Sequence, residues 1–78
     1  MKVSEFLGTK VLDKNAVEIG KVSDMYIDPI NGIINIITIS TGEFGIRKKD
    51  IAIKPDDIAV LGDYLLLNIG KADIDEVD

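Results

Sequence analysis

The 78-residue sequence contains no cysteine and no histidine. A disulfide is therefore impossible, and thiolate nucleophiles, imidazole bases and the usual zinc and haem ligands are missing. A Ser-His nucleophile is excluded as well, because Ser4, Ser23 and Ser40 have no histidine partner in the chain. These absences argue against an enzyme. We predict no catalytic residue, no cofactor and no metal site.

Basic residues are scarce compared with acidic ones. Nine lysines and arginines stand against fourteen aspartates and glutamates, which gives a formal net charge of −5. A negative field repels phosphate backbones, whose attraction to basic side chains supplies most non-specific nucleic-acid affinity. We therefore expect no direct binding of nucleic acid.

Long apolar runs are also missing. No segment approaches the roughly 20 apolar residues that a membrane-spanning helix requires. The start of the chain, residues 1–5, lacks the basic region and apolar core of a secretory signal. We expect a soluble, cytoplasmic protein without membrane insertion.

The chain is long enough for one domain with a small core. A domain of this size buries about 60% of the surface that its unfolded chain exposes. Burial then stabilises it by only about 3–5 kcal/mol, and small domains often add a disulfide, a metal or a second subunit. Association with another chain is the route that this composition leaves open, so we expect contacts with other proteins and a homodimer.

A long β-hairpin is the clearest structural signal. The β-rich runs Ile19–Ile27 and Ile33–Ile39 flank a turn that starts at Asp28 and Pro29 and ends at Gly32. Proline presets φ, aspartate can accept hydrogen bonds from its own downstream backbone, and glycine tolerates a positive φ. The apolar alternation of the first run slips near Gly20 and Lys21, which predicts a β-bulge or sharp bend there.

The rest of the chain shows shorter strands and turns. Ser4–Gly8 and Pro55–Ile58 each predict one helical turn, and the glycine-first loop Gly62-Asp63 predicts a type II′ turn. Five to six short strands with frequent turns indicate an all-β fold, and the length favours a small barrel over a sandwich. The expected strands are Thr9–Leu12, Val17–Ile27, Ile33–Ile39, Ile51–Lys54, Ala59–Leu61 and Tyr64–Leu67.

The last ten residues differ from the rest because they are acidic and have no clear period. We assign residues 1–68 to the barrel and residues 69–78 to an acidic C-terminal tail, either frayed or ordered by a partner. A calcium loop would need a glycine at its sharp turn and ligands at regular spacing, so a solvated tail is favoured over a cation site. The carboxylates concerned are Asp73, Asp75, Glu76 and Asp78.

Three further polar clusters have structural explanations. Asp56 and Asp57 stand at the start of a predicted helical turn, where carboxylates interact favourably with the helix dipole. The basic cluster Arg47–Lys49 has the character of a solvated turn, with docking of an anionic partner as the alternative. The glycines of Gly42–Gly45 lead into a strand, whereas phosphate-binding loops open a helix.

The returning strand of the hairpin is apolar on both faces, because isoleucines occupy positions 33, 34, 36, 37 and 39. A half-exposed strand would alternate apolar with polar residues. Either both faces are covered within one subunit, or the outward face packs against a second copy in a two-fold dimer. Ile37 and Ile39 are the candidate residues for this dimer or partner interface.

Several of these segments, taken in order, resemble the PRC-barrel family, the small β-barrel of the photosynthetic reaction centre H subunit and of a ribosome maturation factor. Ser4–Val11 is similar to the family's opening turn and first strand, and Ile19–Asp24 to its Gly-Lys-Val-x-Asp signature. Asp28–Gly32 resembles its Asp-Pro-x-x-Gly turn. Ile51–Ile58 resembles the closing strand and turn, although Lys54 stands where an apolar residue is expected.

This resemblance extends from about Ser4 to Leu67, and it implies a non-enzymatic adaptor that mediates protein–protein contacts. Stand-alone chains of this size resemble archaeal single-domain proteins, some of which act between other proteins of cell division. The alternative is an accessory factor of RNA processing or ribosome assembly, as the maturation factor's barrel suggests. The negative charge favours the adaptor.

Overall fold

The computed structural model describes residues 1–42, 49–74 and 76–77, the last two by their backbone. Each strand and helical turn predicted above is present, with ends that differ by one or two residues. The elements are α1 (Val3–Phe6), β1 (Lys10–Leu12), β2 (Glu18–Asp28), β3 (Ile33–Thr41), β4 (Lys49–Ile53), the 3₁₀ turn η1 (Pro55–Asp57), β5 (Ile58–Leu61), β6 (Tyr64–Leu67), the 3₁₀ turn η2 (Lys71–Asp73) and β7 (Glu76–Val77).

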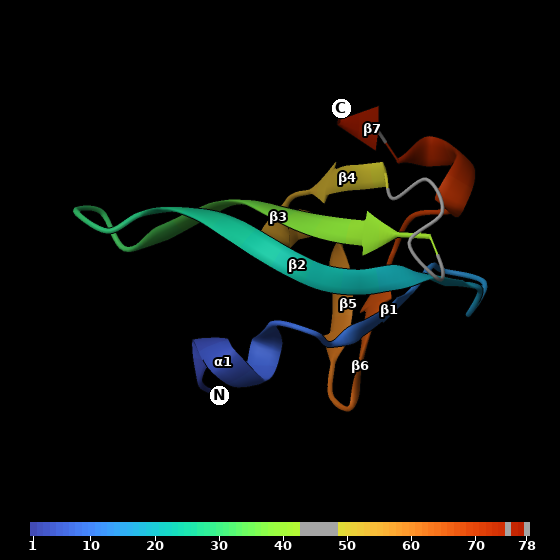
Figure 1. Cartoon of the computed structure of the whole chain (residues 1–78), viewed down its shortest axis with the longest axis horizontal. Coiled ribbons are helices and arrows are strands. Elements are labelled where there is room, and N and C mark those ends of the chain that lie inside the picture. The colour runs from blue at the N-terminus through green and yellow to red at the C-terminus, as the bar shows by residue number, and fades with distance from the viewer. Residues whose placement is uncertain (43–48, 75, 78) are drawn as a thin grey trace.

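The strands form one curled sheet in the order β5-β6-β1-β2-β3-β4-β7 (Figure 1). β1 and β6 pair in parallel, and the other neighbours are antiparallel. This arrangement confirms the predicted small all-β barrel with short helical turns, and the sheet closes only into a half-barrel. The short strand β7 pairs with β4 and adds a strand to the five or six expected. The division at residue 68 stays a prediction.

The concave side of the sheet holds the hydrophobic core. Side chains from α1 and from the strands β1 to β4 and β6 meet there, so segments far apart in sequence share one apolar interior. Burial of this surface is the main favourable term in folding. The core residues are Phe6, Val11, Ile19, Val22, Ile37, Ile39, Ile51, Ile53, Leu65 and Leu67.

β2 points both Ile19 and Val22 into the core, although they are three residues apart. A regular strand would place them on opposite faces. Its pairing with β1 jumps from Gly20 to Glu18, and its pairing with β3 jumps from Val22 to Asp24. Each shift inserts one extra residue and resets the alternation, which confirms the bulge predicted near Gly20.

Gly20 lies where β2 passes close to the backbone of β3. A Cβ at this position would overlap the backbone carbonyl oxygen of Ser40 and would lie 3.2 Å from Cγ2 of Ile39. Because the obstacle is backbone rather than the end of a flexible side chain, a larger residue cannot be accommodated without moving a strand. The close approach therefore requires glycine.

The two predicted hairpin turns have different outcomes. Asp28 Oδ1 accepts the N–H groups of Ile30 and Asn31, at 3.1 and 3.3 Å, and Gly32 has φ +66°, as predicted. The Asn31 side-chain amide also donates to Asp28, and this bond is the main cause of that carboxyl's lowered pKa. Gly62 does not adopt a left-handed φ, so the predicted type II′ turn is wrong.

Asp13 is a buried carboxylate, 3% exposed, in the turn between β1 and β2. Its Oδ1 accepts the N–H groups of Asn15 and Val17 at 2.8 and 2.9 Å, and its Oδ2 accepts the N–H of Lys71 at 3.1 Å. The last bond ties η2 to the first turn of the sheet. The bond from Val17 is the largest contribution, and together these bonds lower the pKa of the Asp13 carboxyl.

Gly20→Ala tests the close approach of β2 to β3. We expect it to lower the free energy of unfolding by about 1–3 kcal/mol, because the new methyl group overpacks against backbone. Gly62→Ala is the matched control, since no atom lies within 4 Å of its added Cβ. Chemical denaturation of both variants checks this, and equal losses would contradict the role given to Gly20.

Asp13→Asn tests the carboxylate link by its pH dependence. A folded-state pKa below the unfolded value of about 3.9 stabilises the protein above that pH, and the contribution disappears as the pH falls through the folded-state pKa. Asparagine keeps an acceptor for Asn15 and Val17 but turns an amide N–H₂ toward the N–H of Lys71. The wild type should therefore unfold at a higher temperature than the variant at pH 7.

The same comparison in acid tests whether the charge of Asp13 is responsible. The difference between wild type and Asp13→Asn in unfolding temperature should shrink progressively below about pH 4, as the wild-type carboxyl takes up its proton. The lowered pKa of Asp28 affects both proteins alike. A difference that stays constant from neutral pH into strong acid would show that the charge of Asp13 is not what stabilises the turn.

Candidate interaction site

The two residues predicted for a dimer or partner interface lie in the core. Ile37 is 1% and Ile39 0% exposed within the single chain. β3 has β2 on one side and β4 on the other at this point, and both side chains belong to the core on the concave side of the sheet. Of the two alternatives given above, the structure shows that these two side chains are covered within one subunit. A dimer stays a prediction that other residues would have to support.

Asp57, from one of the predicted polar clusters, has a structural role. Asp57 Oδ2 accepts the backbone N–H of Lys54 at 2.9 Å, so it caps η1 as expected. Within the ranges that the structure describes, no three acidic side chains lie close enough to hold a metal ion. Other residues of these clusters fall outside the described part of the chain: residues 43–48, Asp75, Asp78 and the side chain of Glu76.

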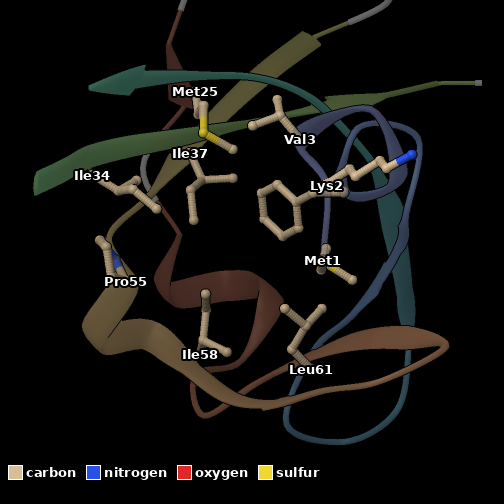
Figure 2. A pocket seen from close by; sticks show the side chains of 10 residues that line it. Met1, Lys2, Val3, Met25, Ile34, Ile37, Pro55, Ile58 and Leu61 are labelled. Carbon is tan, nitrogen blue, oxygen red and sulfur yellow. The ribbon is translucent and has the colours of Figure 1, made fainter. Parts of the chain in front are cut away.

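An apolar groove of about 260 Å³ lies on the surface of the described chain. It lies between α1, the β2–β3 hairpin, and the segment from η1 to the end of β5 (Figure 2). In the figure, side chains from these three segments surround one hollow. The lining consists of Met1, Lys2, Val3 and Phe6 from the first segment, Met25, Ile34 and Ile37 from the hairpin, and Pro55, Ile58 and Leu61 from the third.

The wall formed by α1 depends on Phe6. The helix is a single turn, held by bonds from Phe6 N–H to Lys2 O and from Leu7 N–H to Val3 O. Such a short helix has little stability of its own. Phe6 is buried against the core, and this contact anchors the turn so that Val3 stays beside the hairpin.

The hairpin wall follows from the strand register. Met25 pairs with Ile37, and Ile27 pairs with Ile34. Directly paired residues of antiparallel strands share a face, so Ile27 lies on the groove side and extends its apolar surface toward the end of the hairpin. The surface thus continues beyond the hollow itself.

The groove has an apolar character. Its lining is almost entirely carbon, and the ammonium group of Lys2 is turned away from the hollow in Figure 2. This lining suits the site to contact with apolar groups.

Sequence reasoning missed the groove because its residues come from separate parts of the chain. Residues 1–6, 25–37 and 55–61 meet only after the sheet has curled. The one local signal was that β3 carries isoleucine at position 34 as well as on its buried face. Periodicity does not reveal which other segments face such a residue.

Together, the fold and the groove define a small all-β barrel domain with an apolar surface site. The chain belongs to the PRC-barrel domain family, whose model matches residues 1–74. This family consists of small, non-catalytic β-barrels that often occur in protein-interaction modules. No curated protein matches the chain. In the part of the chain that is described, no helix is long and apolar enough to cross a membrane.

Phe6→Ala tests the anchor of the groove. We expect it to lower the free energy of unfolding by about 3 kcal/mol or more, because it removes a buried aromatic ring and leaves a cavity. Leu7→Ala is the control, since Leu7 is 38% exposed and follows directly in sequence. Chemical denaturation curves measure the loss in free energy of unfolding for each variant. Similar losses for the two variants would contradict the anchoring role of Phe6.

Proposed function

We propose that this chain is a non-enzymatic adaptor that binds an apolar segment of another protein in the groove beside α1. The observation that carries the proposal is the exposure of large apolar side chains around a preformed hollow. Val3 is 59%, Ile34 42% and Leu61 43% exposed, each from a different wall. Exposed apolar patches of this kind commonly mark interaction sites.

Burial of these side chains supplies the driving force. Each Å² of apolar surface removed from water contributes roughly 25 cal/mol, and the hollow needs no rearrangement to receive a side chain. The net charge of −5 adds selectivity, because it favours partner segments with basic flanks and repels acidic ones. The partner is therefore an apolar segment, a helix or a strand, bordered by lysine or arginine.

The family match supports an interaction module without indicating its pathway. We therefore leave the archaeal cell-division role out of the proposal, because no feature of the described chain points to it. The accessory role in ribosome assembly becomes an outcome of the experiment below.

The proposal is tested by affinity capture from the source organism at physiological salt. The wild type is compared with a Val3→Asp, Leu61→Asp double variant, which places two charges in opposite walls of the groove. Val17→Asp is the control, since Val17 is 49% exposed on the turn between β1 and β2 and does not line the groove. Circular dichroism verifies that all three proteins are folded.

We expect the wild type and Val17→Asp to retain the same protein partner and the double variant to lose it. Capture that is equal in all three proteins would contradict the groove as the binding site. Recovery of RNA and ribosomal proteins, lost after nuclease treatment, would favour the ribosome-assembly alternative.

A further inference from the structure

β5 is an end strand of the sheet, with β6 on one side and no described strand on the other. At the opposite end, β7 pairs with β4 and covers part of its edge. β4 also carries charged residues, Lys49 and Asp50, and charges on an edge strand discourage pairing with another chain. β5 reads Ile-Ala-Val-Leu and has neither a charge nor a proline. Of the two ends of the described sheet, β5 is the less protected.

The hydrogen bonds between β5 and β6 show which backbone groups of Leu61 face the open side. Gly62 N–H donates to Tyr64 O at 3.0 Å. These two residues flank the directly opposed pair Leu61 and Leu65. In an antiparallel ladder, a bond between the flanking residues marks the enclosed pair as one without hydrogen bonds of its own. The N–H and C=O of Leu61 therefore point away from β6.

The same pattern occurs at the start of the strand. Asn68 N–H donates to Asp57 O at 2.9 Å, and these residues flank the opposed pair Ile58 and Leu67. The C=O of Ile58 therefore also points away from β6, whereas its N–H donates to Pro55 O. One donor and two acceptors thus face the open side of β5, and none of the three has a hydrogen-bond partner among the described residues.

A bulge places this open backbone beside the groove. Residues three apart in a regular strand, such as Ile58 and Leu61, lie on opposite faces. The register of β5 shifts between Ile58 and Val60, which adds one residue to the strand. The side chains of Ile58 and Leu61 accordingly both line the hollow (Figure 2). The residues with open backbone groups are the ones that form this wall of the groove.

These open backbone groups select an extended strand as the occupant. A helix uses its N–H and C=O groups in its own hydrogen bonds, so a helix in the hollow would leave those of β5 without partners. An extended segment can bond to the edge of β5 and at the same time place every second side chain on the groove side.

We propose that the partner segment binds as an extended strand that adds to the open edge of β5, with apolar side chains at alternate positions in the groove. This inference rests on the proposed function and specifies the form of the bound segment. The occupant is a strand of another protein, and the backbone of β5 contributes to the contact as well as its side chains.

Leu61→Pro tests the backbone contact. Proline removes the N–H that faces the open side, and it is tolerated on an edge strand where that N–H is not bonded to the neighbouring strand. Leu61→Val is the matched control, because valine keeps the N–H and has a side chain of similar size. In the affinity capture described above, we expect Leu61→Val to retain the partner and Leu61→Pro to lower the retained amount about tenfold or more. Circular dichroism verifies that both variants are folded.

The two variants also separate this inference from the proposed function. Equal retention by Leu61→Pro and Leu61→Val, together with loss of the partner by the Val3→Asp, Leu61→Asp double variant, would overturn strand addition and keep the groove. Retention by the double variant would contradict the groove and, with it, the inference that rests on it.

A second readout needs no substitution. Exchange of the Leu61 amide hydrogen, followed by NMR, should be fast in the bare chain and at least tenfold slower in the complex with the captured partner. An amide that stays fast while the methyl signals of Ile58 and Leu61 shift would show a helix or an irregular segment in the groove, and would overturn strand addition. Slowing that grows with the concentration of the bare chain would identify a second copy as the occupant and would overturn it too.

Discussion

The rest of the structure depends on the contact between Gly20 and the backbone of Ser40. At this point β2 changes neighbours, from β1 on one side to β3 on the other, and the two strands pass so closely that no Cβ fits. The bulges on either side bring both Ile19 and Val22 inward. The sheet can therefore curl around a core, and the β2–β3 hairpin supplies one wall of the groove beside α1.

The same strand, β3, has two different environments along its length. Ile37 and Ile39 are fully covered by their own chain, and Ile69 and Ile74 from the segment around η2 pack against the same core. The bond from Lys71 N–H to the Asp13 carboxylate fixes that segment. Toward the turn, Ile33 and Ile34 have no comparable cover. The fold buries half of an apolar strand and presents the other half to solvent, where Ile34 forms part of the groove.

Local chemistry made much of the fold predictable. The hairpin turn follows from the hydrogen-bonding side chain of Asp28 and the positive φ of Gly32, and the bulge follows from the broken alternation near Gly20. The parallel pairing of β1 with β6 was not predictable, because it joins residues more than fifty positions apart. An apolar strand also does not reveal what covers it. Ile37 and Ile39 therefore became interface candidates, and the groove, which needs three distant segments, was missed.

The central claim is that the apolar surface formed by α1, the hairpin and β5 is where this protein contacts others. Hydrogen–deuterium exchange of the bare chain, compared with the chain isolated together with its bound partner, tests it most directly. We expect slower exchange on binding in residues 3–7, 24–36 and 55–61, with β1 and β6 unchanged. Slower exchange confined to β1, β6 or β7 would contradict it.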